Sequence, residues 1–103
     1  IAREEIFGPV ASILPVDDVE QAVSIANDTP YGLAASVWTA DLAKAHRCVK
    51  ALEAGMVWVN SFDEMDMAVP FGGYKQSGNA KDNCMQSVLG YTQEKAAWIS
   101  LAE

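Results

Sequence analysis

Two patterns of apolar and polar positions alternate along the chain as far as Asn60, and they predict an α/β order of elements. Short apolar runs at residues 10–16, 33–38 and 56–59 have the length of buried strands. Between them, apolar residues recur at helical spacing. Strand, helix, strand, helix, strand in this order is the pattern of a right-handed parallel crossover sheet.

Capping residues predict the limits of the first helix. Asp18 is followed by Gln21 three positions later, which matches a capping box ahead of the apolar stripe. Pro30 disfavours helical geometry in the residue before it, so the helix is expected to stop by Thr29. Residues 31–32 are then expected to turn the chain.

The second helix is expected to start after a Thr39 cap, with Asp41 in its first turn, where the helix dipole favours a carboxylate. Gly55 follows the helix and is expected in a left-handed conformation. The apolar stripe predicted to face the sheet is Leu42, Ala45, Val49 and Leu52.

The pattern changes after Asn60. Residues 61–68 are rich in acidic and polar side chains and predict a loop, and residues 70–74 predict a glycine-dependent turn. Lys75 and Ser77 are expected to hold this turn in place. Residues 84–89 are long enough for one or two helical turns. Residues 92–101 alternate and end in an apolar run, which predicts a terminal strand.

Size and charge limit the classes of function. The chain has 103 residues and a formal net charge of −7, which indicates about one small domain and argues against nucleic acid, whose phosphates require Lys and Arg. No apolar run approaches the roughly 20 residues that span a bilayer, and no signal peptide is recognisable. We therefore expect a cytoplasmic protein with no nucleic acid and no membrane partner. Because the first residue is not Met, we expect the chain to be cut from something longer.

The two cysteines, Cys48 and Cys84, could form a disulfide, but nothing indicates secretion, so we interpret both as reduced thiols. His46 is the only histidine, and neither cysteine has a second Cys or a spaced His that would make a metal site. We expect no bound metal.

Four blocks in the chain carry a resemblance to a known family, in order and at ordinary spacings. The blocks are Glu4-Glu5-Ile6-Phe7-Gly8-Pro9-Val10, Ala26-Asn27-Asp28-Thr29-Pro30-Tyr31-Gly32-Leu33, Gly55-Met56-Val57-Trp58-Val59-Asn60 and Pro70-Phe71-Gly72-Gly73-Tyr74-Lys75-Gln76-Ser77-Gly78. Together they resemble the aldehyde dehydrogenase superfamily from end to end.

This resemblance implies an α/β fold: residues 1–90 as the C-terminal part of a catalytic domain with a Rossmann-like three-layer sheet, and residues 91–103 as an oligomerisation strand. It implies a homo-oligomer that associates through residues 91–101, although the strand could instead fold back onto its own sheet. It places the catalytic cysteine and the general-base glutamate outside this segment. Neither Cys48 nor Cys84 matches the nucleophile, so we expect no catalytic residue in the chain.

The resemblance also implies cofactor-binding residues. Glu5 is expected to accept hydrogen bonds from the nicotinamide ribose hydroxyls of NAD or NADP, a task that suits a carboxylate with several acceptor lone pairs. Phe7 is expected to limit the positions of the nicotinamide ring. Alternatively, Glu5 is a solvated carboxylate and Phe7 is ordinary core packing. The residues that distinguish NAD from NADP would lie outside this chain.

The expected substrate-binding residues for an aldehyde are Phe62, Met65, Asp66 and Phe71, on or beside the loop in which family members differ. Phe71 is expected to line the substrate tunnel, or else to plug the sheet edge. The acidic loop resembles the branch that oxidises γ-glutamyl-γ-aminobutyraldehyde in putrescine breakdown, and carboxylates there would suit an aldehyde bearing an amine. Alternatively, the loop is a solvated acidic segment.

The chain departs from the family pattern after Gly78. Many members have a Gly-Arg-Glu run there, whereas residues 79–82 read Asn79-Ala80-Lys81-Asp82. Two functions remain open: part of an NAD(P)-dependent enzyme that oxidises an amino- or amide-bearing aldehyde, or a non-catalytic truncated oligomerisation module. An unrelated small α/β binding domain does not explain four ordered blocks.

Overall fold

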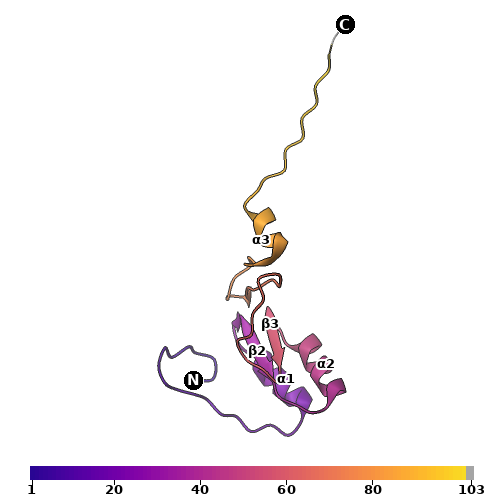
Figure 1. The fold of residues 1–103 in the computed structure, drawn as a ribbon. Helices are drawn as coiled ribbons and strands as arrows, with labels where there is room; N and C mark the ends of the chain where they lie inside the picture. The colour runs from indigo at the N-terminus through magenta and orange to yellow at the C-terminus, as the bar shows by residue number, and fades with distance from the viewer. Residues whose placement is uncertain (102–103) are drawn as a thin grey trace.

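The computed structural model describes residues 1–101 and confirms the α/β class (Figure 1). The elements are α1 (Val19–Asn27), β1 (Tyr31–Gly32), β2 (Ala34–Val37), α2 (Leu42–Ala51), β3 (Met56–Val59), β4 (Tyr74–Lys75) and α3 (Cys84–Gly90). Within the described residues the strands form two two-stranded sheets, β1-β4 and β2-β3.

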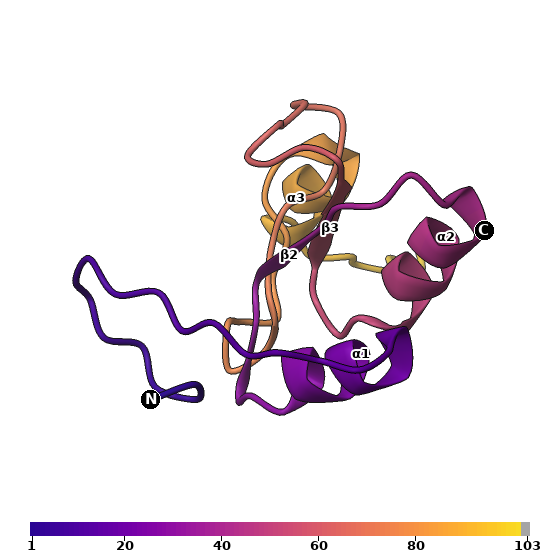
Figure 2. The ribbon, with the colours of Figure 1, turned by 90° about the horizontal axis from the view of Figure 1, so that it is seen from below.

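The β2-α2-β3 segment is the predicted parallel crossover. β2 and β3 pair in parallel from Ala34 opposite Met56 to Val37 opposite Val59. Helix α2 packs against both strands, and α1 packs against α2 (Figure 2). The side chains buried most deeply are Ala45, Cys48 and Trp58, so the small core lies between α2 and β3.

The first helix begins and ends where its caps predicted. The Asp18 carboxylate accepts a hydrogen bond from the Gln21 amide at 2.7 Å. The Gln21 side chain returns the contact one residue earlier than a capping box requires, because its Oε1 accepts from the amide of Asp17 at 2.6 Å. The helix stops at Asn27, as expected ahead of Pro30.

The second helix differs from its prediction in its cap and its buried face. Asp41, not Thr39, is the cap and accepts from the Lys44 amide at 3.0 Å, while Thr39 accepts from the Asp41 amide. Cys48 is buried beside Ala45, whereas Leu42 is 73% exposed. The predicted stripe was wrong at Leu42, where the helix starts, and at Val49, which is 41% exposed, because the buried face of α2 runs through Ala45 and Cys48.

Two predictions near the glycines were also wrong. Residues 31–32 are not a turn but a short strand, in which Tyr31 lies opposite Lys75 and Gly32 opposite Tyr74. Gly55 is not left-handed, since Gly78 is the one described glycine with a positive φ. A Cβ at Gly55 would collide with the Gly72 carbonyl, so this glycine is required by the close approach of two backbones.

The apolar segments near the two ends of the chain, residues 10–16 and 92–101, lie outside both sheets. Residues 10–16 form no strand, and Ile13 is 92% exposed. Residues 92–101 also form no strand, so the fold-back alternative is wrong for the described residues, and residues 102–103 of the expected strand lie outside them. Figure 1 shows this tail running away from the folded part. An apolar segment becomes a strand only where a neighbour supplies hydrogen-bond partners, and these segments find none within the chain.

The overall dimensions reflect these open ends. The accessible surface is 8619 Å², against about 5,700 Å² for a folded monomer of this mass. The radius of gyration is 19.6 Å, against about 13 Å for a chain of this length. Much apolar surface is therefore left uncovered by the chain's own residues.

Three simpler expectations concern cysteines, metals and membranes. Both cysteines are free thiols, Cys48 buried and Cys84 partly exposed. Over residues 1–101, no cluster of three or more potential metal-ligating side chains occurs. In the same part of the chain, no helix has the length and apolar character needed to cross a membrane.

Candidate cofactor and substrate sites

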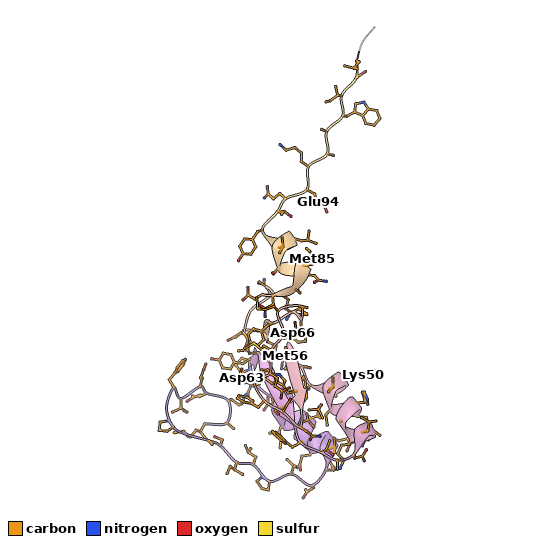
Figure 3. All side chains as sticks on the ribbon, viewed as in Figure 1. Lys50, Met56, Asp63, Asp66, Met85 and Glu94 are labelled. Atoms are coloured by element: carbon orange, nitrogen blue, oxygen red, sulfur yellow. The ribbon has the colours of Figure 1, made fainter. Side chains whose placement is uncertain are left out.

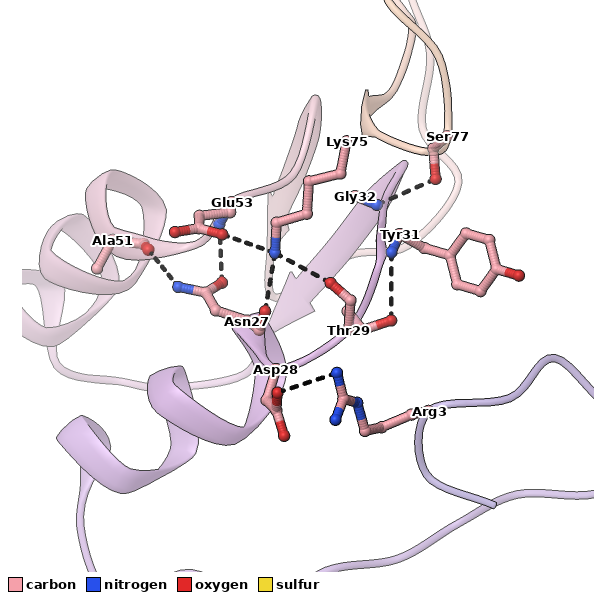
Figure 4. A network of polar contacts seen from close by, with 10 residues as sticks. All are labelled: Arg3, Asn27, Asp28, Thr29, Tyr31, Gly32, Ala51, Glu53, Lys75 and Ser77. Carbon is pink, nitrogen blue, oxygen red and sulfur yellow. Dashed lines mark hydrogen bonds and ion pairs between the residues drawn. The ribbon is translucent and has the colours of Figure 1, made fainter.

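A polar network joins the C-terminal ends of α1 and α2 to the turn after β4 (Figure 4). Lys75 donates from Nζ to the carbonyl of Asn27 at 2.8 Å and pairs with the Glu53 carboxylate at 2.6 Å. The Asn27 side chain donates to the Ala51 carbonyl and accepts from the Glu53 amide, both at 2.9 Å. These bonds fix the C-terminal ends of both helices. Asn27 and Lys75 thus form a floor at these helix ends.

Ser77 completes this floor, as its place beside the glycine turn predicted. Its hydroxyl accepts a hydrogen bond from the Gly32 amide at 3.0 Å. Lys75 was likewise expected to hold the turn, and its contacts confirm this. Asn27 is the member that sequence reasoning missed, although it stands in one of the four blocks. A C-terminal Asn ahead of a proline was a usable signal, because its side chain can bond nearby backbone groups.

Glu5 lies beside the same floor. It lines a cavity of about 330 Å³ together with Asn27, Thr29, Gly32 and Ser77. It also lines a second cavity of about 380 Å³, which includes Phe7. The N-terminal segment is attached here by an exposed pair between Arg3 and Asp28 at 3.5 Å.

Phe7 has an exposed ring and an unfavourable backbone conformation in this chain. Its ring is 88% exposed, and its backbone has a φ of 55°, the left-handed region that non-glycine residues avoid. The core-packing alternative is therefore wrong for Phe7 within this chain. Outliers of this kind concentrate at functional sites, where a surrounding structure holds them for a task.

The loop that follows Asn60 is anchored by a tryptophan near the end of β3. Trp58 is buried, and its indole N–H donates to the Glu64 carbonyl at 2.7 Å. The ring of Phe62 packs against it with 5.5 Å between centroids and 58° between planes. Phe62 and Met65 are otherwise exposed, so the loop presents an aromatic and a thioether side chain outward.

Asp66 has a structural task in the same loop. One carboxylate oxygen accepts from the Ala68 amide at 2.8 Å, and its own carbonyl accepts from the Val69 amide at 3.0 Å. This is the geometry of an Asx turn. Figure 3 shows Asp66 and Asp63 in this loop region. Asp66 therefore bends the chain a few residues before Phe71.

Phe71 lies half-buried at the foot of the loop. Its amide donates to the Asp82 carbonyl at 3.0 Å, and the Asp82 amide returns a bond at 2.7 Å. This bridge fixes the backbone of Phe71 while its ring stays partly accessible. This bridge lies outside both sheets, so the tunnel-wall and edge-plug interpretations of Phe71 both stay predictions.

The expected site residues thus fall into two groups. Phe62, Met65, Asp66 and Phe71 share one loop and its base, whereas Glu5 and Phe7 share the N-terminal segment. Neither cavity lined by Glu5 includes a residue of the loop group. The chain by itself holds two separate candidate half-sites.

The N-terminal group fits the nicotinamide–ribose end of a dinucleotide. Glu5 is exposed and offers carboxylate lone pairs that suit a vicinal diol, and Phe7 offers an open ring face of a size that matches a flat heterocycle. Among the described residues, Arg3 is the one cationic side chain that lines the cavity of about 330 Å³ with Glu5, and it already pairs with Asp28. The surroundings therefore suit hydroxyls and a ring rather than phosphates.

The chain belongs to the aldehyde dehydrogenase family. A sequence model described as "Aldehyde dehydrogenase family" matches residues 1–97. The chain is 52% identical, over 98% of its length, to the NADP/NAD-dependent aldehyde dehydrogenase PuuC of Escherichia coli K12, of which it covers 20%.

Two solved structures share this fold. One is the AldA indole-3-acetaldehyde dehydrogenase of P. syringae in complex with NAD+ and IAA: 59% identity, TM-score 0.89, with 97% of this chain and 20% of that one covered. The other is the gamma-glutamyl-gamma-aminobutyraldehyde dehydrogenase of Burkholderia cenocepacia: 59% identity, TM-score 0.84, with 88% and 19% covered. The chain spans about a fifth of the length of the proteins it matches.

Proposed function

We propose that this chain supplies the C-terminal part of the catalytic domain of an NAD(P)-dependent aldehyde dehydrogenase, which oxidises an aldehyde to a carboxylic acid. The observation that carries the proposal is that Glu5 and the left-handed Phe7 both stay exposed in a segment that matches the family, with Glu5 lining a cavity beside Asn27 and Ser77. A carboxylate and an aromatic ring that contribute little to their own chain's packing are well suited to a ligand.

The chain's residues would orient the cofactor. NAD(P) supplies the oxidising chemistry when bound, and the protein supplies position and electrostatics. Glu5 accepts hydrogen bonds from ribose hydroxyls, and these are strengthened by its charge. Phe7 restricts the ring to a narrow range of positions. Relatives that are described as NAD(P)-dependent or that hold NAD+ support this assignment.

For the substrate, we propose an aldehyde bearing an amino or γ-glutamylamino group, as in putrescine breakdown. The free carboxylate oxygen of Asp66, beside Asp63 and Glu64, gives the loop a negative charge that attracts an amine. Overall identity does not decide this point, since the indole-3-acetaldehyde and γ-glutamyl-γ-aminobutyraldehyde enzymes are equally similar to the chain. The charge of the loop is the feature that favours the amine.

We also propose that the protein is cytoplasmic and that residues 91–101 associate with a second subunit. The exposed apolar side chains of the unpaired tail support association, because they gain most from a neighbouring sheet. The same tail keeps a second function open, in which the chain is a non-catalytic oligomerisation module.

A chimera separates the two functions. The segment of the E. coli relative that matches this chain is replaced by residues 1–101, and NADH formation from γ-glutamyl-γ-aminobutyraldehyde is measured. We expect an active enzyme, in which Glu5→Gln lowers the rate of cofactor reduction by roughly tenfold through loss of charge-assisted bonds, with an unchanged melting temperature. The control is Glu20→Gln, which removes only an exposed pair with Arg47.

A folded but inactive chimera would refute the enzyme assignment and leave the oligomerisation module. A Glu5→Gln rate equal to that of the parent chimera would show that Glu5 is a solvated carboxylate. The unmodified 103-residue chain is expected to produce no NADH with any aldehyde, because neither of its cysteines is placed as a nucleophile.

A further inference from the structure

The Lys81 side chain makes a set of three polar and aromatic contacts around one turn. The ammonium group donates to the Gly72 carbonyl at 2.8 Å and to the Gly73 carbonyl at 3.2 Å. It also lies 4.6 Å from the centroid of the Tyr74 ring. A lysine has three N–H donors. Two are satisfied by carbonyls and the third side of the ammonium faces an aromatic ring, so the group is well matched to this place.

The surroundings of Lys81 are crowded with backbone. A Cβ on Gly72 would collide with the Ala80 carbonyl, and a Cβ on Gly55 would collide with the Gly72 carbonyl. Three segments that are distant in sequence therefore meet without side chains between them. Carbonyl dipoles brought together in this way repel one another, and a cation among them is stabilising.

The next residue extends this contact to the substrate loop. Asp82 forms two backbone hydrogen bonds with Phe71, immediately ahead of the turn that Lys81 holds. Residues 80–82 thus lie along residues 71–73 and grip them by both main chain and side chain. Phe71 has little freedom to move unless Lys81 releases the turn.

We propose that Lys81 is a positioning residue that fixes Phe71 against the aldehyde through the Gly72-Gly73 turn. The inference rests on the proposed function, since it takes Phe71 as a wall of the aldehyde site. Lys81 does not line either cavity that includes Glu5, so its influence is directed to the aldehyde and not to the cofactor. A residue that merely stabilised the fold would affect both ligands.

The test compares Lys81→Met, Lys81→Arg and Lys50→Met in the chimera. Methionine keeps the length of the side chain and removes its donors, and arginine keeps the charge and the donors. Lys50 is an exposed lysine of α2 with no part in either half-site and serves as the matched control. Two quantities are measured: the KM values for aldehyde and for NAD+, and hydrogen–deuterium exchange at the amides of Phe71 and Asp82.

We expect Lys81→Met to lower kcat/KM for the aldehyde by roughly tenfold or more, mainly through KM, because a small misplacement at a site has a large effect on rate. The KM for NAD+ stays unchanged, the two amides exchange faster, and Lys81→Arg restores most of the loss. Equal losses for both ligands, or unchanged exchange at both amides, would overturn the inference. A folded but inactive parent chimera would refute the proposed function. Unchanged amide exchange in Lys81→Met would separately refute the role of Lys81 in fixing Phe71.

Discussion

The β2-α2-β3 segment and the two terminal segments contain similar apolar residues. The first is folded and partly buried, whereas the terminal segments are exposed. Trp58 in β3 is 8% exposed, and Trp98 in the tail is 94% exposed. The runs at residues 10–16 and 56–59 are both short and apolar, yet only the second is a strand. The difference is the presence of a pairing partner within the chain: β3 has β2 beside it, and residues 10–16 have none. An apolar run is able to form a strand, but it does so only where a neighbouring strand pairs with it.

The half-sites follow the same division. The floor of Asn27, Lys75 and Ser77 is complete within the chain, because every partner it needs is present. Glu5 and Phe7 stand on the terminal side of the division and remain exposed. The supporting network is thus complete within the chain, whereas the two candidate cofactor residues are not covered by the chain's other described residues.

The largest expected effect contrasts the two tryptophans. Trp58→Ala should lower the free energy of unfolding by about 3–5 kcal/mol, since it empties the small core and leaves the Glu64 carbonyl without its indole donor. Trp98→Ala should change it by no more than about 0.5 kcal/mol. Urea denaturation followed by circular dichroism measures both, and Trp58→Phe provides a milder variant that stays folded. Similar losses at the two positions would remove the distinction between the regions.

The second prediction contrasts two glycines. Gly72→Ala should cost about 1–3 kcal/mol, because the new methyl group meets the Ala80 carbonyl, a backbone atom that cannot move aside cheaply. A methyl group on Gly8 would meet no atom within 4 Å, so Gly8→Ala should be neutral or stabilise the chain by up to about 1 kcal/mol. Thermal melting of the two variants checks the difference, and a stable Gly72→Ala protein would contradict the close approach.

The third prediction concerns a substitution that should not lower stability. Phe7→Gly removes an exposed ring and relieves a left-handed backbone, so the stability should stay unchanged or rise by up to about 1 kcal/mol. In the chimera, the same variant should weaken NAD+ binding, as isothermal titration calorimetry would show. A clear loss of stability without a change in NAD+ affinity would instead make Phe7 a packing residue.

A smaller effect concerns pH and the cap of α2. The hydrogen bond from the Lys44 amide, opposed weakly by desolvation, lowers the pKa of Asp41 below its usual 3.8. A lowered pKa in the folded state means that the cap stabilises fully above the unfolded value and that this contribution is lost as pH falls through the folded pKa. Helix content measured by circular dichroism should therefore drop below about pH 3.8 more in the wild type than in Asp41→Asn, whose cap does not titrate. Superimposable acid transitions would exclude this role.

The smallest effect on folding is expected from removal of the tail. Deletion from Thr92 onward should leave the free energy of unfolding within about 0.5 kcal/mol, because residues 92–101 form no strand and are exposed in the part of the chain that the structure describes. Light scattering should nevertheless show that self-association of the full chain is lost on deletion. Equally monomeric full-length and deleted chains would contradict association through residues 91–101.

Local signals in the sequence predicted much of this fold. Asp18 and Pro30 set the limits of α1, and the run at residues 56–59 coincides with β3. Lys75 and Ser77 hold the glycine turn as expected. These predictions succeed because each depends on residues a few positions apart or on a short apolar run whose partner is present.

Tertiary contacts decided the rest. The pairing of β1 with β4, the close approach of Gly55 to Gly72 and the grip of Lys81 on the turn all join residues distant in sequence. Sequence by itself determined the limits of α1, the β2-α2-β3 order and the family, because capping, periodicity and motif spacing are local properties. Only the tertiary structure decided which apolar segments are buried and which carboxylates are free, because burial and hydrogen bonding depend on what the folded chain brings alongside.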